Sequence, residues 1–342
     1  MPSRFAFMVS FPPVILLKKR LFLFCLIPVL LLGACRAEQL SETTLFAMDT
    51  VMELRVYGDD RQECRRIIQA LETELSVTDP DSQLSRLNAA GKAELDGELL
   101  ELLRRTLALS EQTGGALDPT VYPIVRLWGF TTEEYRVPED AEIAQTLQTV
   151  GTAHVQMDGD LVTLTDGAML DLGAVAKGYA AAQCAAYLER RRLCGILTLG
   201  GNVQTVGTKP DKSDWQVGIR NPFDSEKVIG ALSLTGSNAV VTSGGYERYF
   251  ERDGVRYHHI IDPATGRPAD NELASVTVVC DDGFTADGLS TALFVMGLDK
   301  ATDYWREHQD FEAVFITNSG MMFVTSGLAE RISTNAPVEM IE

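Results

Sequence analysis

The sequence predicts an α+β fold in which largely antiparallel sheets are flanked by separate helices. Strand-like runs follow one another across short turns, and the helical patterns interrupt these runs without alternating regularly with them, which disfavours a βαβ winding. The composition of the 342 residues, 45% hydrophobic and 23% charged, is typical of a globular protein with room for one large or two medium domains.

The N-terminal segment has the features of an export signal. Basic residues at positions 18–20 precede an apolar run over residues 21–32, which is too short for a membrane-spanning helix of about 20 residues. The following LGAC resembles the lipobox of bacterial lipoproteins, in which Cys35 would carry the lipid; an ordinary signal peptide that contains a cysteine is the alternative. We therefore expect a signal peptide over residues 1–34, a tether over residues 35–43, and a protein anchored by lipid to the membrane of the bacterial cell envelope, facing the periplasm or the cell exterior.

The chain is strongly acidic, with a formal net charge of −18 that becomes more negative when the basic leader is removed. Such a chain is a poor candidate for binding nucleic acid through phosphate contacts. An anionic ligand would need local positive charge from a lysine, a helix N-terminus or a metal ion. The cysteines after the leader lack the C-x-x-C spacing of a metal site, and no disulfide pairing is predicted among Cys64, Cys184, Cys194 and Cys280.

After the leader, the chain reads first as a strand and then as helices separated by turns. Residues 44–56 alternate as a strand does, and residues 60–75 place apolar side chains at helical spacing. SVTDPDS is a turn by composition, residues 84–88 form a short segment, and the leucine spacing over residues 96–113 predicts a second long helix. TGGALDPT then predicts a loop.

The remaining chain adds short strands and three further helices. A Gly-Asp turn joins two strands into a hairpin, and an alanine-rich helix follows a strand that ends at Leu170. The predicted strands cover residues 154–158, 161–165, 195–199, 215–219, 229–234, 239–243, 255–261, 275–279, 313–317 and 321–325, and the helices cover residues 141–149, 175–192 and 287–296. We expect one domain over residues 44–330 and a C-terminal tail over residues 331–342.

The segment DLGAVAKG, at a predicted strand-to-helix corner, has the composition of an anion-binding turn. Asp171 would end the strand, Gly173 would lie in the turn, and Lys177 would lie in the first helical turn, where backbone N–H groups and the helix dipole favour an anion. The segment lacks the G-K-[ST] ending of a P-loop. Taken alone, it fits a packing corner with a surface salt bridge equally well.

Two further segments carry candidate chemistry. His258 and His259 are adjacent at a strand end, so one can face a site while the other packs, although a surface pair without function also fits. Asp287 and Thr291 share one helix face, where a carboxylate and a hydroxyl suit Mg²⁺; an N-cap at Asp287 and a buried hydroxyl at Thr291 are the structural alternative. Glycine pairs in LGGN and TSGGYERYF would let backbone approach a ligand.

Taken together and in their order along the chain, the segments named next resemble the ApbE family of FAD:protein FMN transferases. The matching segments are FAMDT, DSQLSRLN, TGGALDPTVYPIVRLWGF, LDLGAVAKGYAA, LGGN, WQVGIRNP, VVTSGGYERYF, HHIIDPATGRP and TADGLSTALFVMG. The resemblance implies an ApbE-like, two-lobed fold with the FAD site between the lobes. It also implies an enzyme that binds FAD and Mg²⁺, attaches FMN through a phosphoester bond to a threonine hydroxyl of another protein, and releases AMP. The implied acceptor is a flavoprotein, such as an FMN-binding domain or a subunit of a membrane redox complex.

The resemblance also implies roles for individual residues. The FAD contacts would be Met48, Thr78, Ala116, Leu117, Asp118, Asp171, Lys177 and Ile260. The Ala174 carbonyl and the side chains of Asp287 and Thr291 would bind Mg²⁺, which makes Asp287 a catalytic residue. An acceptor threonine is a weak nucleophile that needs a base, and His259 is the candidate.

Two positions depart from the family pattern and leave other functions open. Asp49 stands where glycine is more frequent, and Thr78 stands where many transferases have a tyrosine. Without that aromatic lid, adenine would be held less tightly and water admitted, so a Mg²⁺-dependent FAD pyrophosphatase that yields FMN and AMP is the alternative. A flavin-binding lipoprotein without turnover is a third reading, which predicts the loss of Lys177, Asp287 or His259; all three are present.

Overall fold

The computed structural model describes residues 39–342, of which Leu40–Glu342 form one compact unit. The expected signal peptide, the lipidation site Cys35 and the first part of the expected tether lie outside the described residues. No helix in the described part of the chain has both the length and the apolar character needed to cross a membrane.

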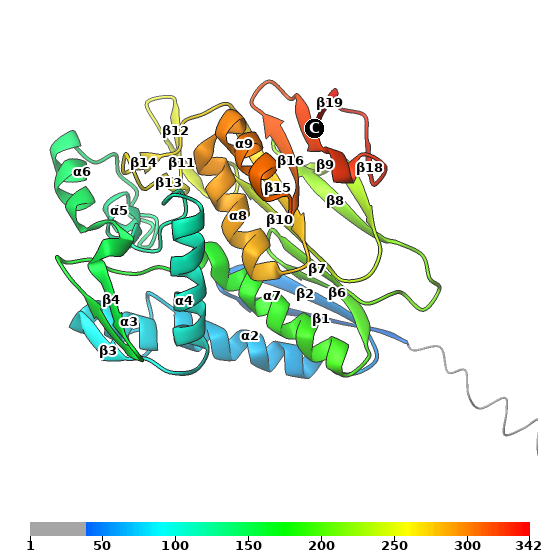
Figure 1. Cartoon of the computed structure of the whole chain (residues 1–342), viewed down its shortest axis with the longest axis horizontal. Helices are drawn as coiled ribbons and strands as arrows, with labels where there is room; N and C mark the ends of the chain where they lie inside the picture. The colour runs from blue at the N-terminus through cyan, green and yellow to red at the C-terminus, as the bar shows by residue number, and fades with distance from the viewer. Residues whose placement is uncertain (1–38) are drawn as a thin grey trace, which may run out of the picture. The chain divides into compact units, whose positions relative to one another are not determined.

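A nine-stranded sheet forms the centre of the compact unit (Figure 1). Its neighbouring strands are antiparallel except for the last two in the spatial order, which are parallel. In spatial order the strands are β1 (Leu40–Ala47), β2 (Thr50–Tyr57), β6 (Cys194–Leu199), β7 (Asn202–Val206), β10 (Asn238–Gly244), β15 (Leu273–Cys280), β16 (Glu312–Thr317), β17 (Met322–Thr325) and β19 (Val338–Ile341). The predicted α+β class with largely antiparallel sheets is therefore confirmed.

Smaller sheets surround the central one. Three strands, β8 (Trp215–Asn221), β9 (Asp224–Leu234) and β18 (Ile332–Thr334), form one of them, and β3 (Lys92–Glu94), β5 (Leu161–Leu164) and β4 (Val155–Asp158) form another. Two strand pairs complete the set: β11 (Tyr249–Arg252) with β12 (Val255–His258), and β13 (Ile261–Asp262) with β14 (Arg267–Pro268). Figure 1 shows β3–β5 and β11–β14 at one end of the unit and the central sheet at the other.

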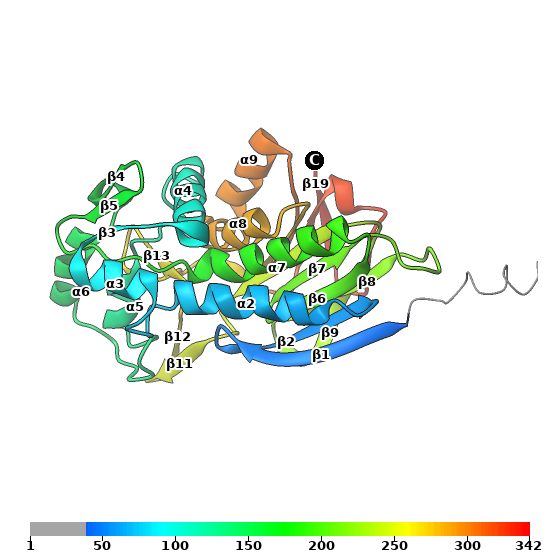
Figure 2. The ribbon, with the colours of Figure 1, turned by 90° about the horizontal axis from the view of Figure 1, so that it is seen from below.

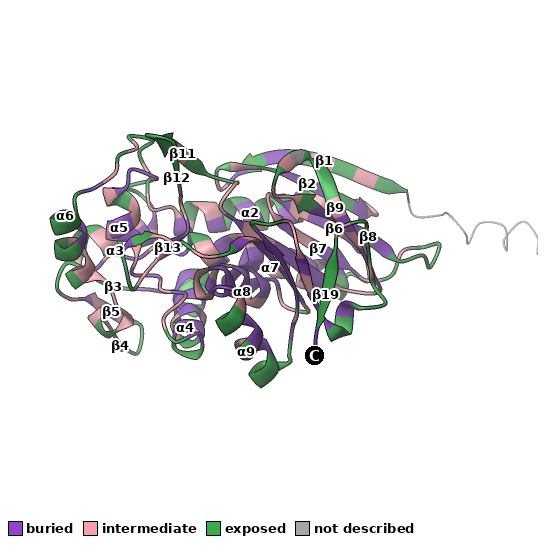
Figure 3. Ribbon diagram, turned by 90° about the horizontal axis from the view of Figure 1, so that it is seen from above, coloured by how far each residue is buried: buried purple, intermediate pink, exposed green. Residues whose placement is uncertain are grey.

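Helices cover one face of the central sheet. Figures 1 and 2 show α7 and α8 running along this face, with α2 beside α7. The helices are α2 (Arg61–Leu75), α3 (Gln83–Ala90), α4 (Gly97–Gln112), α5 (Tyr122–Leu127), α6 (Asp140–Thr146), α7 (Gly173–Arg190), α8 (Gly283–Met296) and α9 (Leu298–His308), with 3₁₀ turns at Leu147–Thr149, Thr152–His154 and Ser326–Leu328. Buried residues concentrate on α7, α8 and the strands next to them (Figure 3).

The central strands bury both of their faces. Val241 and Val278 pack into the core that includes the helices, whereas Val240 and Val279 pack into a second core with residues of β8 and β9. A strand that is covered on both sides needs apolar residues at successive positions, and β10 and β15 accordingly read as continuous apolar runs. The central sheet is thus held between α7 and α8 on one side and the β8–β9 sheet on the other.

The predicted single strand over residues 44–56 is wrong, because the structure has two strands there. The turn that joins β1 to β2 consists of Met48 and Asp49, whose φ angles of 48° and 57° lie in the left-handed region. The buried positions change from odd numbers in β1 to even numbers in β2, which is the signal of the turn. The unbroken apolar run at residues 45–48 conceals that change.

The expected ends of the domain also need correction. β1 begins at Leu40, so residues 40–43 of the expected tether belong to the central sheet. The expected tail over residues 331–342 supplies β18 and β19. In β19 only Ile341 is buried, so no apolar alternation reveals the strand.

The strand predicted to end at Leu170 is absent from the structure. Only an isolated bridge between Val121 and Met169 occurs there. The side chain of Asn88 holds Leu170 instead: its Nδ2 donates to the Leu170 carbonyl at 2.8 Å, and its Oδ1 accepts from the Leu170 N–H at 2.7 Å. These two hydrogen bonds imitate strand pairing and keep the chain extended into the corner that follows.

Candidate active site

The DLGAVAKG corner begins α7 with an acidic side chain instead of an ordinary cap. The helix starts at Gly173 after Leu172, which provides no side-chain cap, and Asp171 Oδ1 accepts a hydrogen bond from the Gly173 N–H at 2.7 Å. Lys177 lies in the second helical turn, one turn later than the sequence predicted, and its Nζ donates to the Gly173 carbonyl at 3.3 Å. Both charged side chains therefore stay at the N-terminal end of α7.

Asp171 joins this corner to the GALDPT loop. Its backbone N–H donates to the Pro119 carbonyl at 2.8 Å. Burial raises the pKa of the Asp171 carboxyl, against the opposing effects of the Gly173 N–H and the charges of Arg248 and Lys177. A carboxylate in this environment is stabilised further by each hydrogen-bond donor or cation that a ligand brings to it.

The GALDPT loop is ordered by its own side chains. Asp118 Oδ1 accepts hydrogen bonds from the N–H of Thr120 at 2.8 Å and from its hydroxyl at 2.5 Å, and burial raises the Asp118 pKa. Leu117 is buried, whereas Ala116 is half-buried against the main core. The loop thus presents backbone beside Asp171, as a nucleotide-lining loop would.

Asp287 is placed by a very close crossing of α7 and α8. A Cβ on Gly178 would lie 2.5 Å from the Asp287 Cβ and would also overlap the Gly283 carbonyl, so only glycine permits this approach. The Gly178 N–H donates to Asp287 Oδ2 at 2.7 Å. Asp287 is not the N-cap of α8, because Asp282 takes that position and accepts from the Thr285 N–H.

Burial dominates the electrostatics of Asp287. The side chain is 4% exposed, and desolvation raises its pKa, while Lys177, the Gly178 N–H and Asn202 oppose that rise. Asn202 turns its side chain toward the carboxylate, although its Nδ2 makes no well-formed hydrogen bond. A buried carboxylate in this setting gains stability from any added cation.

The donor set near Asp287 fits a hard cation such as Mg²⁺. Thr291 lies one turn later on α8, and the Ser243 hydroxyl approaches its hydroxyl to 3.3 Å. In a regular helix the Gly178 N–H donates to the Ala174 carbonyl, and here the same N–H donates to Asp287 Oδ2. Residues 39–342 contain no group of three or more His, Cys, Asp and Glu side chains arranged for a metal. A Mg²⁺ site built on Asp287 and Thr291 would combine carboxylate and hydroxyl oxygens with carbonyl and substrate oxygens.

His259 is held in one orientation by the backbone of the preceding hairpin. Its Nδ1 lies 3.1 Å from the Arg248 carbonyl, and its N–H donates to the same oxygen at 3.0 Å. Because a carbonyl only accepts, Nδ1 carries the proton in the neutral ring and Nε2 keeps its lone pair. Burial, followed by the charge of Arg248, lowers the His259 pKa to about 3, and Lys177 acts in the same direction. The ring is therefore neutral near pH 7, and its Nε2 lone pair can accept a hydrogen bond from an acceptor hydroxyl.

Of three further predicted FAD contacts, only Ile260 adjoins a residue of this centre. Met48 is half-buried in its hairpin turn, with its N–H donating to Glu72 Oε1 at 2.7 Å, and Ile260 is buried beside His259. Thr78 is exposed in a turn where its N–H donates to the Ser76 hydroxyl. The structure shows no direct contact of Met48 or Thr78 with Asp171, Lys177 or Asp287 in the part of the chain that it describes.

The sequence reasoning missed several residues that support these side chains. Asn88 and Asn202 stood inside the matching segments DSQLSRLN and LGGN, but their partners are 82 and 85 positions away in the chain. Arg248 supplies both the carbonyl that orients His259 and a charge that lowers its pKa. Ser243 reaches Thr291 from β10. Only the glycine-rich composition of LGGN and TSGGYERYF signalled that these turns approach a site.

Comparison with known proteins identifies the family of this chain. A model of the ApbE family matches residues 48–315. The FAD:protein FMN transferase of Klebsiella pneumoniae is 35% identical over 297 residues, which cover 84% of this chain and 92% of the relative; that of Treponema pallidum is 34% identical over 328 residues, covering 88% and 90%.

Solved structures give the same result. The ApbE protein of Thermotoga maritima superimposes with a TM-score of 0.79 at 35% identity, covering 83% of this chain and 96% of that one. The flavinyl transferase ApbE of Pseudomonas stutzeri superimposes with a TM-score of 0.75 at 28% identity, covering 88% and 95%. The family match, the identities and the shared fold all extend over most of the described residues, and this chain therefore belongs to the ApbE family.

Proposed function

We propose that this protein is a Mg²⁺-dependent FAD:protein FMN transferase that attaches FMN through a phosphoester bond to a threonine hydroxyl of a target flavoprotein and releases AMP. The observation that carries the proposal is the α7–α8 crossing, where the buried carboxylate of Asp287 lies in the field of Lys177. His259 also lies in that field. The names of the relatives, FAD:protein FMN transferase, support the same reaction.

Each step of the transfer has a residue suited to it. Lys177, at the N-terminal end of α7, would bind the pyrophosphate of FAD, because the positive end of the helix dipole adds to its charge. The hydroxyl of the acceptor threonine would lose its proton to His259 Nε2 as its oxygen forms a bond to the FMN phosphorus. The bond from that phosphorus to the bridging oxygen then breaks, and AMP leaves with the oxygen.

The residues that would hold Mg²⁺ are Asp287, Thr291 and the Ala174 carbonyl. When bound there, the ion would neutralise charge that develops on the phosphoryl oxygens. Asp287 supplies the formal negative charge of the set, and its fixed position against Gly178 would hold that charge in one place.

One mixture separates transfer from its alternatives. The chain from Glu38 is incubated with FAD, Mg²⁺ and a purified FMN-binding acceptor domain, while AMP release and acceptor mass are followed. AMP together with a mass gain of one FMN unit is expected. AMP without that gain indicates a pyrophosphatase, and the absence of AMP indicates binding alone; either result overturns the proposal.

His259 gives the proposal a residue-level test. Replacing it as His259→Gln should slow transfer on the order of 10²–10⁴-fold, because the acceptor hydroxyl loses its base. The matched control is His308→Gln, which changes an exposed histidine at the end of α9. Full transfer activity in His259→Gln would remove the base assignment.

The pyrophosphatase remains the second candidate because of one observation. Thr78 is exposed, and the SVTDPDS turn around it carries no aromatic side chain that would cover adenine. If water replaces the acceptor, a Thr78→Tyr variant should lower the ratio of free FMN to protein-bound FMN in the same mixture. An unchanged ratio would show that the residue at position 78 does not determine whether water replaces the acceptor.

Location and partner complete the proposal. We propose that Cys35 carries a lipid that anchors the protein to the bacterial cell envelope, facing the periplasm or the cell exterior. The acceptor would then be a subunit of a membrane redox complex or an FMN-binding domain exposed on the same side. Cell fractionation of the natural protein and of Cys35→Ala, followed by mass spectrometry of residue 35, tests the anchor.

A further inference from the structure

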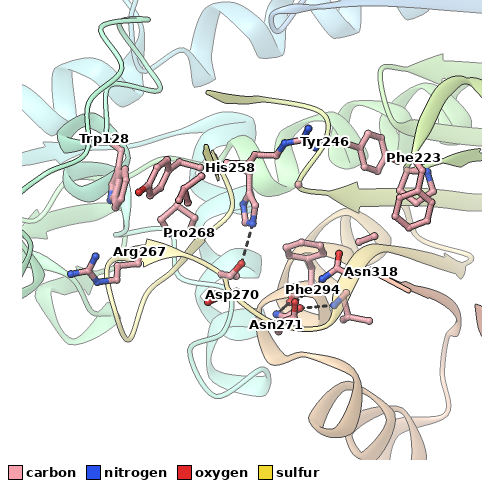
Figure 4. A pocket seen from close by; sticks show the side chains of 18 residues that line it. Trp128, Phe223, Tyr246, His258, Arg267, Pro268, Asp270, Asn271, Phe294 and Asn318 are labelled. Carbon is pink, nitrogen blue, oxygen red and sulfur yellow. Dashed lines mark hydrogen bonds between the residues drawn. The ribbon is translucent and has the colours of Figure 1, made fainter. Parts of the chain in front are cut away.

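A cavity of about 470 Å³ is lined by none of the predicted site residues (Figure 4). Trp128, Tyr246, Tyr257 and Phe294 contribute aromatic rings to its walls, beside charged and amide side chains such as Arg267. His258 also lines it, whereas His259 does not. Because neighbouring residues at a strand end turn to opposite sides, the two histidines separate the cavity from the candidate site.

The chain connects the cavity to the candidate site at two further places. Phe294 lies three residues after Thr291 on the same face of α8, and its ring meets His258 edge-on with centroids 5.5 Å apart. Tyr246 belongs to the segment whose Arg248 carbonyl orients His259. A bound polypeptide whose hydroxyl lies at His259 would therefore place its neighbouring residues near the cavity.

Exposed apolar side chains gather at the mouth of the cavity. Phe223 and Val255 line it and are 55% and 51% exposed. Tyr249, the cross-strand partner of His258, is 40% exposed. Single exposed apolar residues are ordinary, but a group around an aromatic cavity is typical of a surface that binds another protein.

Two residues of the cavity wall also have unused hydrogen-bonding capacity. The Tyr246 hydroxyl and His258 Nδ1 are buried and have no hydrogen-bond partner among residues 39–342. Both atoms are buried within the wall, so they offer almost no surface to a molecule in the cavity. The apolar rings of the wall therefore favour an occupant that is mainly apolar.

We propose that this cavity and its rim bind the acceptor protein, with an aromatic or large aliphatic side chain of the acceptor entering the cavity a few residues from the hydroxyl that receives FMN. This inference rests on the proposed transferase function. The rim favours a protein because a small molecule held in the cavity leaves Phe223 and Tyr249 exposed. The site would select the acceptor, whereas the residues around Lys177 and Asp287 would select FAD.

Two surface variants test the proposal without disturbing the core. Phe223→Ser removes an exposed rim side chain, and Asn318→Trp places a bulky side chain at an exposed position of the cavity lining. Their matched controls are Val228→Ser, which is exposed on the same β8–β9 hairpin outside the cavity, and Ser319→Trp, which changes the neighbouring exposed residue. Thermal unfolding checks that all four variants fold.

The measurement is the steady-state rate of transfer from FAD and Mg²⁺ to a purified FMN-binding acceptor domain as the acceptor concentration varies. We expect KM for the acceptor to rise at least about tenfold in both test variants, equivalent to about 1.4 kcal/mol of lost binding. KM for FAD, and every constant of the controls, should stay within about twofold of the unmodified protein.

Other results overturn the inference in distinguishable ways. Unchanged acceptor KM in the test variants, with normal transfer by the unmodified protein, refutes the docking site and leaves the proposed function standing. A changed KM for FAD shows that the cavity serves the flavin or another small molecule instead of the acceptor. Failure of the unmodified protein to transfer FMN refutes the proposed function itself.

Discussion

At the scale of single residues, the carboxylate of Asp287 is buried, which is unfavourable for a charged group, and it is also a proposed ligand of Mg²⁺. Its carboxylate is removed from water, and one oxygen is engaged by the Gly178 N–H. Such a group lowers the stability of the metal-free protein and gains stability from a bound cation. The same burial that makes Asp287 a suitable metal ligand therefore makes it a local weakness when no metal is present.

Asp287→Asn should raise the melting temperature of the metal-free protein and abolish its response to Mg²⁺. The amide retains an oxygen for the Gly178 N–H but has no charge to desolvate. Thermal unfolding with and without Mg²⁺ measures both effects, and AMP release should be lost in parallel. Asp281→Asn, on the exposed surface just before α8, is the control. Equal stabilisation of both variants by Mg²⁺ would show that Asp287 is not a ligand.

His259 should make the folded protein sensitive to acid. Its pKa falls from 6.5 to about 3 on folding because burial disfavours the charged ring. Between these values the unfolded chain binds more protons than the folded one, so the free energy of unfolding decreases as pH is lowered from about 6.5 toward 3. Urea unfolding at several pH values should give a flatter pH dependence for His259→Gln than for the unmodified protein. Parallel curves would contradict the depressed pKa.

The sequence predicted the proposed reacting residues more completely than the residues that hold them in position. Asp171, Lys177 and Asp287 were identified because they stand in segments that resemble those of a known family, and the structure places Lys177 in the field of both acids. Asn202 and Arg248 were missed because their importance comes from contacts between distant segments. Neither a side-chain type nor a local spacing reveals such contacts.

At the scale of elements, α7 and α8 act as one unit through their glycines. Gly178 and Gly283 meet at the crossing and leave no space for a side chain on either. This approach lets the backbone of α7 hydrogen-bond to an acidic side chain of α8. The geometry of the proposed metal site therefore depends on two residues that have no side chain.

Gly178→Ala should separate α7 from α8 and destabilise the protein by about 1–3 kcal/mol, as overpacking of a core does. It should also weaken the stabilisation by Mg²⁺, because Asp287 loses its fixed position. Denaturant unfolding with and without Mg²⁺ measures both quantities. Arg190→Ala, at the exposed end of α7, should leave both unchanged. A Gly178→Ala protein as stable as the unmodified one would show that the crossing can relax.

Predictions of elements succeeded where one face is buried and failed where the burial pattern is hidden. Helices α2 and α4 lie within one residue of their predicted ends because their apolar spacing is regular. The β1–β2 turn was missed because apolar residues occupy both faces before it. Of β7, only Asn202 was interpreted, as the end of the LGGN turn, and residues 203–206 were assigned no element, although β7 is an interior strand of the central sheet.

At the scale of the whole molecule, the first and last strands of the described residues form the edges of one sheet. β1 is the first strand of the central sheet and β19 is the last. Between them, each strand has neighbours on both sides, and the helices that carry Lys177 and Asp287 pack on the face that these strands create. The proposed site thus depends on a sheet that is complete only when the C-terminal residues are in place.

Removing residues 332–342 should therefore destabilise the entire unit. β17 would lose its parallel partner β19, β9 would lose β18, and the main core would lose the buried side chain of Ile341. Exposing the backbone of a sheet edge also favours aggregation, so soluble yield should fall together with the melting temperature.

The control for this truncation is the double variant Val338→Ser and Met340→Ser. Both side chains are exposed, so the substitutions keep the backbone pairing of β19 and should change the melting temperature little. If the truncated chain instead melts at the same temperature as the full one, β18 and β19 are an appendage, and the boundary near residue 330 that the sequence predicted is the real end of the cooperative unit. If it melts earlier in one transition, the last strand belongs to the same cooperative structure as the α7–α8 crossing.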